Sequence, residues 1–299
     1  MEPLRRPAHS SSMKDRIDPL IAERAPWLYR TAPGIGMLRG GLHLALGYDR
    51  TLEIAESLRS EPSAKIMHTM AQLLAKRVAV TGLTHIPTHG AALIVANHPT
   101  GIADGIILQH LLTTRRDDSY FFANSDILRV LPQMSAMITP VEWRKDKRSH
   151  AKTRETMANV HKAVDAGRLG VIFPSGRLAK RRGLKLYERP WMASAAMLAR
   201  KFDMSVIPVN IQARNSALFY LFDAVHPTLR DVTLFHETLN KDRQSFEVTV
   251  GEPIAPSALP TKPDEAIAML RKTTLALGET DQRTPVRWFN QIGRTAAFD

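Results

Sequence analysis

The chain has 299 residues, 44% of them hydrophobic, so it is long enough to form one large domain or two small ones with a substantial core. It contains no cysteine, which excludes disulfides, thiolate nucleophiles and cysteine metal sites. The formal net charge of +12 favours polyanionic partners, namely nucleic acid, anionic lipid surfaces or acidic carrier proteins. Aromatic residues make up only 6% and do not alternate with the basic residues, which argues against stacking on single-stranded bases.

The first part of the chain is predicted to be a tail followed by helices. Residues 1–15 are charged, contain proline and have no apolar core behind them, so we expect a disordered terminus and no signal peptide. Residues 16–79 carry apolar side chains at helical spacing, with breaks expected at Gly40-Gly41 and at residues 61–63. No apolar stretch reaches the roughly 18 residues of a spanning helix, so no transmembrane segment is expected.

Strand-like and helix-like segments alternate over residues 80–260, the expected core, and a C-terminal helix and tail are expected over residues 261–299. The expected strands are residues 77–82, 91–96, 137–141, 169–173, 205–211 and 246–250, the last of which closes the sheet. The expected helices are residues 106–112, residues 151–166, a segment opening at Pro190 and a segment from Pro263 to Gly278. This alternation predicts an α/β fold with a mostly parallel central sheet flanked by helices, and with an N-terminal helical segment.

The most informative segment follows the apolar run of residues 91–96. The run is short and contains β-branched residues, as in a strand buried on both faces. Pro99 and Gly101 then break the strand, so His98 is expected at the carboxyl end of a strand, where α/β sheets place their ligands. Asp104 lies near the start of the following helix, close enough to fold back on the imidazole.

A pair of His98 and Asp104 suits general-base chemistry. The carboxylate fixes the tautomer of the imidazole and stabilises the imidazolium that forms when the ring takes a proton. Such a pair can draw a proton from an alcohol or amine that attacks an activated acyl group. The alternative is that the two residues only cap the start of the helix.

Two dense basic clusters follow expected strands. The first consists of Arg144, Lys145, Lys147, Arg148, Lys152 and Arg154, and the second of Arg177, Lys180, Arg181, Arg182, Lys185 and Arg189. In a parallel sheet, both would lie at the same edge as His98 and could bind an anionic group. The alternative is two solvated basic loops.

Five motifs occur in a fixed order along the chain: residues 82–87, the Asn97-His98 turn, Phe173 to Arg177, residues 206–209 and residues 250–254. In this order they resemble the glycerolipid and lysophospholipid acyltransferase superfamily over roughly residues 78–255. Residues 214–219, 226–230 and 237–241 are similar to its haemolysin-related branch, which includes acyltransferases of bacterial ornithine-lipid synthesis. The resemblance implies an acyltransferase catalytic core over residues 80–260.

The resemblance also implies roles for individual residues. His98 and Asp104 match the catalytic dyad. The implied substrate-binding residues are Asn97, Thr100, Gly101, Arg144, Lys145, Phe173, Pro174, Ser175, Gly176, Arg177 and Lys180. Pro99 and Pro208 are expected to shape the backbone near the site. No metal and no bound cofactor are expected, and the acyl donor is expected to be acyl-ACP or acyl-CoA.

Two positions depart from the usual pattern of the family. Five residues separate His98 from Asp104, where the family has four, although the haemolysin-related branch carries this longer loop with proline and glycine inside it. The third motif, Phe173 to Arg177, is called the third block below. In the family it usually reads Phe-Pro-Glu-Gly, and here Ser175 replaces the acid. Ser175 could donate a hydrogen bond in its place, but it lacks the Gly-x-Ser-x-Gly elbow of a hydrolase nucleophile.

The resulting hypothesis is a membrane-associated O-acyltransferase that acylates a lysolipid hydroxyl, of the lysophosphatidic acid or lyso-ornithine lipid type. The alternatives are a thioesterase or lipid hydrolase, and a non-catalytic lipid- or nucleic-acid-binding protein. Acyl carrier protein and an anionic membrane surface are candidate partners, and nucleic acid is not expected. The expected location is cytoplasmic, on the inner face of the cell membrane. Candidates for membrane contact are the N-terminal helices and a tail with Arg283, Arg287, Trp288, Phe289 and Arg294.

Overall fold

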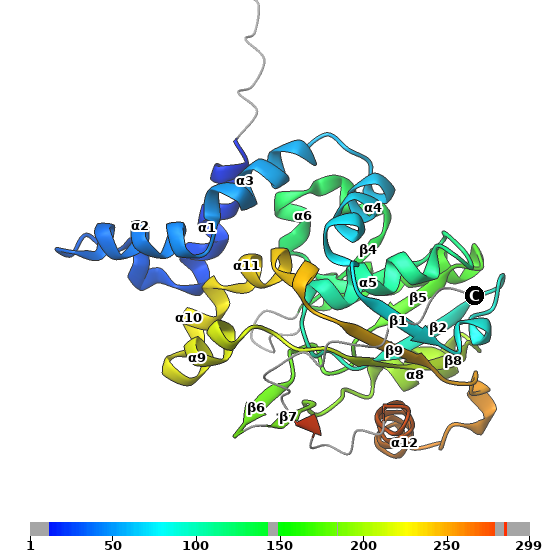
Figure 1. Ribbon diagram of the computed structural model, residues 1–299. Coiled ribbons are helices and arrows are strands. Elements are labelled where there is room, and N and C mark those ends of the chain that lie inside the picture. The colour runs from blue at the N-terminus through cyan, green and yellow to red at the C-terminus, as the bar shows by residue number, and fades with distance from the viewer. Residues whose placement is uncertain (1–11, 143–148, 184, 279–283, 286–299) are drawn as a thin grey trace, which may run out of the picture.

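The computed structural model describes residues 12–142, 149–183, 185–278 and 284–285, and its centre is a seven-stranded sheet (Figure 1). Across the sheet the strands are β1 (Val78–Thr81), β9 (Phe246–Val250), β8 (Ser205–Gln212), β2 (Ala92–Ala96), β5 (Leu169–Ile172), β3 (Tyr120–Asn124) and β4 (Ile138–Val141). Strands β8, β2, β5, β3 and β4 are parallel, whereas β9 pairs antiparallel with β8, and β1 runs with β9. The predicted α/β fold with a mostly parallel sheet is therefore confirmed, with two reversed strands at one side. β9 lies inside the sheet, so the expectation that it closes the sheet is wrong.

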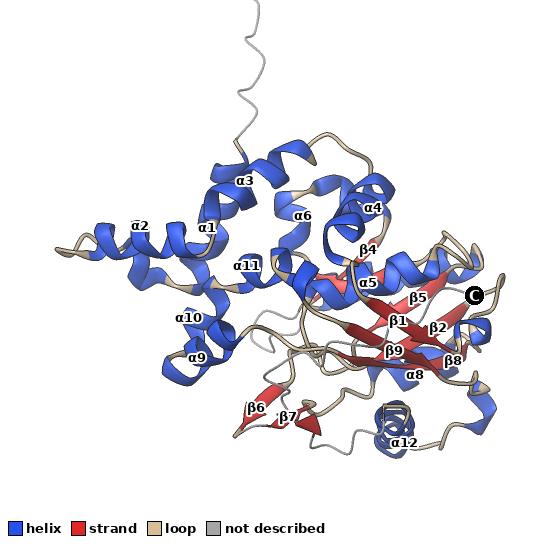
Figure 2. Cartoon of the chain, viewed as in Figure 1, coloured by secondary structure: helices blue, strands red, loops and turns tan. Residues whose placement is uncertain are grey.

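Helices cover both faces of the sheet, as Figure 2 shows. On one face lie α4 (Ser63–Leu74) and α5 (Ile102–Leu112), and on the other lie α7 (His150–Asp165), α8 (Ser194–Lys201) and α12 (Pro263–Ala276). Successive residues of a strand point to opposite faces, so in β2 Ile94 belongs to the first core layer while Leu93 and Val95 belong to the second. All three are fully buried, which explains why the run contains no polar residue.

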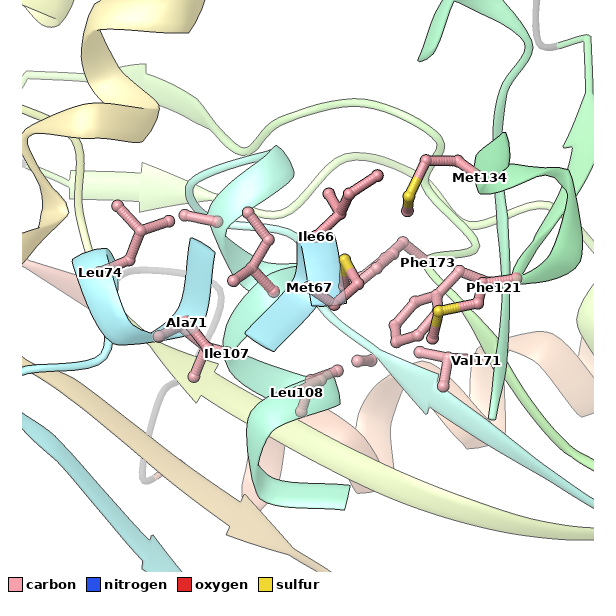
Figure 3. Packing of buried hydrophobic residues seen from close by; sticks show 14 of the residues in the cluster. Ile66, Met67, Ala71, Leu74, Ile107, Leu108, Phe121, Met134, Val171 and Phe173 are labelled. Atoms are coloured by element: carbon pink, nitrogen blue, oxygen red, sulfur yellow. The ribbon is translucent and has the colours of Figure 1, made fainter. Parts of the chain in front are cut away.

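The first core layer fixes the helix that follows β2. Figure 3 shows Ile66 and Met67 of α4 in the same cluster as Ile107 and Leu108 of α5 and Phe121 of β3. α5 is buried on most of its circumference, as expected for a helix that is apolar on all sides. Since α5 is held between α4 and the sheet, its first turn is fixed relative to the end of β2.

The N-terminal helices continue this layer. They are α1 (Met13–Arg24), the 3-10 helix η1 (Pro26–Tyr29), α2 (Ile35–Ala45) and α3 (Tyr48–Ser57). α1 begins inside the stretch expected to be disordered, because Ser12 and Asp15 form a reciprocal capping box. Residues 1–11 lie outside the described residues. α2 runs through Gly40-Gly41, so the break expected there is wrong; the turn comes instead at Gly47, which has a positive φ of 62°.

The chain after β5 also differs from expectation. An antiparallel hairpin of β6 (Lys180–Arg182) and β7 (Lys185–Tyr187) follows, and β10 (Thr284–Pro285) pairs with β7. The helix expected to open at Pro190 begins four residues later, at Ser194. The remaining helical elements are η2 (Leu83–His85), α6 (Asp126–Val130), η3 (Pro132–Ala136), α9 (Ala217–Val225), α10 (Pro227–Val232), α11 (Leu234–Leu239), η5 (Lys241–Arg243) and η6 (Pro256–Ala258).

Within the described ranges, every helix is too short or too polar to cross a bilayer.

Candidate active site

The candidate site lies where β2 and β5 end. These neighbouring strands are parallel, with Ile94 in register with Val171, so the loops that follow them emerge side by side at one edge of the sheet. His98 lies in the first loop, and Phe173 opens the second. Their rings stack with centroids 4.3 Å apart and an interplanar angle of 25°. Because Phe173 also belongs to the hydrophobic core, the imidazole rests on a fixed surface.

The structure brings His98 and Asp104 together. Nδ1 of His98 lies 2.9 Å from Oδ2 of Asp104, with the aspartate side chain 0% exposed and the histidine side chain 18% exposed. The interval of five residues therefore does not separate them. Asp104 occupies the third position of α5, where the helix N-terminus favours negative charge.

Asp104 is held by the loop that carries His98. The backbone N–H groups of Thr100 and Gly101 each donate to Oδ2 of Asp104 at 2.9 Å, and the Thr100 hydroxyl donates to Oδ1. Gly101 has a φ of 95°, which residues with a Cβ rarely adopt, and a Cβ there would lie 3.1 Å from a Leu178 methyl carbon. Glycine thus permits the turn that lets this loop wrap around the carboxylate.

Two residues expected to bind substrate are instead engaged within the protein. Asn97 is buried, and its side-chain amide donates to the carbonyl of Ile211 at 2.9 Å while its oxygen accepts from the N–H of Ile211 at 2.7 Å. Thr100 is buried against Asp104. Asn97 therefore ties the end of β2 to β8, and Thr100 orients the carboxylate. Pro208 lies within β8, opposite Val95 of β2.

The third block folds back onto residues 97–101, the loop between β2 and α5 that carries His98 and is called the histidine loop below. The N–H of Ala179 donates to the carbonyl of His98 at 3.1 Å, and Gly176, with a φ of 58°, closes a turn onto the carbonyl of Phe173. Pro174 and Ser175 are buried, and the Ser175 hydroxyl donates to the carbonyl of Arg177 at 2.8 Å. Of the predicted basic ligands, Arg177 and Lys180 are exposed beside the site, whereas Arg144 and Lys145 lie outside the described residues.

Glu188, which the sequence analysis missed, lies directly beside His98. It follows β7, and its carboxylate accepts the Trp191 indole N–H at 3.0 Å and the backbone N–H of His98 at 3.4 Å. Burial raises the pKa of Glu188, while Trp191, His98 and the Ser175 hydroxyl oppose that rise. Ninety residues separate Glu188 from His98 and no motif surrounds it, so only the folded chain identifies it.

A group of arginines lies close to the third block. Burial lowers the pKa of Arg189, and the positive charges of Arg177, Arg230 and Arg182 lower it further, against Asp223. Within the described part of the chain, the buried Nε of Arg189 has no hydrogen-bond partner. A concentration of guanidinium groups with an unmet donor is suited to an anionic ligand such as a carboxylate or a phosphate.

A second buried group of charged residues, Lys241 and Glu237, lies near Asp104. Lys241 and Glu237 are fully buried with Nζ and Oε2 3.0 Å apart, and Glu237 also accepts the backbone N–H of Ser216 at 2.8 Å. Burial favours a raised pKa for Glu237, but Lys241 and the Ser216 hydrogen bonds outweigh it and hold that pKa below its ordinary value. Burial lowers the pKa of Lys241, which interacts electrostatically with Asp104 as well as Glu237. The pair joins the start of α9 to the end of α11.

Among the described residues, His, Asp and Glu side chains form no group of three that could hold a metal ion.

Comparison with known proteins gives four further findings. A family model described as Acyltransferase matches residues 77–212, which include His98, Asp104, the third block and Glu188. The chain is 23% identical over 206 residues to a lyso-glycine lipid O-acyltransferase of Phocaeicola vulgatus, covering 66% of this chain and 71% of the relative. It is 23% identical over 250 residues to a lyso-glycine lipid O-acyltransferase of Bacteroides thetaiotaomicron, covering 80% of this chain and 87% of the relative. A crystal structure of the 1-acyl-sn-glycerophosphate (LPA) acyltransferase PlsC from Thermotoga maritima aligns with a TM-score of 0.47 and 14% identity over 82% of this chain and 96% of that chain.

Proposed function

We propose that the chain is a member of the glycerolipid acyltransferase superfamily and that it transfers a fatty acyl group from a thioester donor to the hydroxyl of a lysolipid. One observation carries the mechanism: the His98 imidazole lies 2.9 Å from a fully buried Asp104 at the edge of the sheet where α/β folds bind ligands. The donor is an acyl-ACP or an acyl-CoA, since both present the same thioester.

His98 acts as the general base in this proposal. Nδ1 faces Asp104, so Nε2, across the ring, receives the proton of the acceptor hydroxyl while its oxygen bonds to the thioester carbonyl carbon. The tetrahedral intermediate collapses with cleavage of the carbon–sulfur bond, and the imidazolium returns the proton to the departing thiolate. Asp104 stabilises the imidazolium between these two steps.

The proposal does not use the backbone N–H groups of His98, Thr100 and Gly101 to stabilise the oxyanion of the tetrahedral intermediate. Those of Thr100 and Gly101 donate to Asp104, and that of His98 donates to Glu188. These hydrogen bonds instead hold the His98–Asp104 pair in position before the substrate binds. Such pre-organisation of the base contributes to the rate.

The arginines beside the third block favour an acceptor with an anionic head group. Arg177 and Arg189 supply guanidinium donors for a carboxylate or a phosphate, and the interaction between their charges disfavours leaving the site empty of anions. Lyso-glycine lipid, lyso-ornithine lipid and lysophosphatidic acid are the acceptors to compare, since the relatives are named for the first and the others carry such groups.

Docking on an anionic membrane surface brings the site to its lipid acceptor. α2 exposes Met37 and Leu44 almost completely, at 85% and 83%, and α9 exposes Leu221 and Val225. Both helices lie at the left-hand end of the molecule in Figure 1, away from the seven-stranded sheet. Exposed apolar side chains on a basic protein are suited to the interface of an anionic bilayer.

The direct test is acyl transfer from labelled acyl-ACP and acyl-CoA to this panel of acceptors in mixed micelles. We expect His98→Ala to lower kcat by about 10²–10⁴-fold, the range for loss of a general base. The matched control is His161→Ala, because His161 and Asp165 form an exposed pair on α7 with the same ring-to-carboxylate contact, at 3.0 Å. Near-normal transfer by His98→Ala, or hydrolysis of the donor without transfer, would contradict the proposal.

A further inference from the structure

The third block lacks its usual acid, yet the structure holds a carboxylate at that place. Ser175 occupies the position where the acid is expected; its hydroxyl donates to the carbonyl of Arg177 at 2.8 Å and lies close enough to Glu188 to oppose the rise of that carboxyl's pKa. The same carboxylate accepts the backbone N–H of His98 at 3.4 Å and the indole N–H of Trp191 at 3.0 Å. One side chain therefore joins the histidine loop to the third block.

The backbone around Glu188 is built to hold this position. The carbonyl of Glu188 accepts from Nη2 of Arg271 at 3.2 Å, and the N–H of Met192 donates to the carbonyl of Pro174 at 3.0 Å. On the preceding strand, Leu186 packs against Phe219 and Tyr220 of α9. The hairpin is thus attached to the third block on one side and to α9 on the other.

We propose that Glu188 supplies the carboxylate of the third block from thirteen residues further along the chain, and that it positions His98 for the reaction. In this proposal, the acid that the family carries inside the motif is replaced by Glu188, which directly follows the β6–β7 hairpin. Glu188 is a positioning residue, since it acts through the backbone of His98 and through Ser175. This inference rests on the proposed acyl transfer.

The proposed role of Glu188 depends on the charge and the shape of its side chain. A carboxylate offers two accepting oxygens, one for Trp191 and one for His98, whereas glutamine offers one oxygen and an NH₂ that repels the second donor. We therefore expect Glu188→Gln to lower kcat by about 100-fold through misplacement of the base, with KM for the acyl donor within twofold of the wild-type value.

A reciprocal exchange tests whether the two positions share one role. Glu188→Ser should lose activity as Glu188→Gln does, and the double variant Ser175→Glu/Glu188→Ser should regain at least tenfold of the lost kcat. Ser175→Glu alone would place two carboxylates in one buried site, so its Tm should fall by several degrees and recover in the double variant. Additive changes in Tm would show that the two side chains do not share a site and would overturn the inference, whatever the activity.

His98→Ala, assayed beside these variants, separates the inference from the function on which it rests. If His98→Ala is inactive while Glu188→Ser keeps kcat within threefold of wild type, acyl transfer stands and the role of Glu188 is wrong. If His98→Ala remains active, the proposed function fails, and the Tm cycle alone decides whether the carboxylate has been relocated.

Discussion

Asp104 combines two tasks in one side chain, because the oxygen that faces His98 also accepts the N–H groups of Thr100 and Gly101. Replacement by asparagine keeps the shape but removes the charge and one accepting oxygen. We expect Asp104→Asn to lower kcat by at least about 100-fold, since the imidazolium loses its counter-charge. The loss of a charged cap should cost about 1–2 kcal/mol of stability.

Kinetics and thermal melting of the same preparation separate these two effects. Asp165→Asn is the matched control, because Asp165 faces His161 at the surface and lies on α7. An Asp104→Asn protein with normal kcat and a lowered Tm would leave only a capping role for this carboxylate.

Lys241 is a fully buried cation whose partner Glu237 is equally buried. Lys241→Met would leave the Glu237 charge without its counter-ion, which costs about 3–5 kcal/mol for a buried pair. The expected result is a large fall in the denaturant midpoint, while the exposed pair Lys262 and Glu265 gives a control in which Lys262→Met changes little. Equal effects of the two lysine substitutions would contradict the structural role of the buried pair.

The dyad could be predicted from sequence because both residues belong to one strand–turn–helix unit. A strand pattern, a Pro-Gly turn and a helix start place His98 and Asp104 within reach of each other without knowledge of the rest of the fold. Glu188 could not be predicted, because its place depends on how the hairpin docks on α9 and α12. The side-chain hydrogen bonds of Asn97 and Thr100 could not be predicted either. The sequence does not show whether a polar residue next to a site binds a ligand or another part of the protein.

At the scale of elements, local patterns predicted those that bury a regular face. β2, α7 and α12 lie close to their expected bounds. Pairing direction was not predictable, because the alternation of residues 246–250 is the same in a parallel and an antiparallel strand. The hairpin strands have only three residues each, too few for an alternation to stand out in the sequence. Gly40-Gly41 lies inside α2, where a Cβ at either position would meet open space.

Arg116 connects loops at the edge of the sheet opposite the site. Its guanidinium donates to the carbonyls of Pro87, Gly90 and Gly167 at 2.6–3.1 Å, and to both oxygens of Asp118 at 2.6 Å. The hydrogen bonds from Arg116 outweigh burial and hold the pKa of Asp118 below its ordinary value of 3.8. Asp118 therefore contributes to the stability of this edge only while it is ionised.

The pH dependence of that contribution follows from the lowered pKa. It is present in full above the unfolded-state pKa and is lost as the pH falls through the lower folded-state pKa. We expect Asp118→Asn to cost about 1 kcal/mol near neutral pH, a value reduced for the partial exposure of the carboxylate. In thermal melts the difference from wild type should shrink below about pH 4 and vanish below the folded-state pKa. A difference that grows on acidification would contradict this account, and kcat should be unchanged because the site lies at the other edge.

On the scale of the whole molecule, the proposed membrane docking draws on both charge and exposed apolar surface. The net charge of +12 attracts an anionic surface over a distance set by the ionic strength, whereas apolar side chains act only after contact. We therefore expect separable effects. The arginines beside the third block should set the dependence on salt and anionic lipid, and the apolar residues of α2 and α9 should set the strength of insertion. The predicted contribution of the tail, Arg283 to Arg294, lies outside the described residues apart from Thr284 and Pro285.

Flotation with liposomes tests this separation. Met37→Ser/Leu44→Ser should lower the partition coefficient on anionic vesicles by about thirtyfold, because each of the two buried apolar side chains contributes on the order of 1 kcal/mol. Met197→Ser is the matched control, since Met197 is 55% exposed on α8, on the other face of the sheet from α4 and α5. Salt should weaken binding of wild type and of the double variant by the same factor, because neither substitution removes a charge. If the double variant and the control float alike, α2 does not enter the bilayer, and its proposed part in docking is wrong.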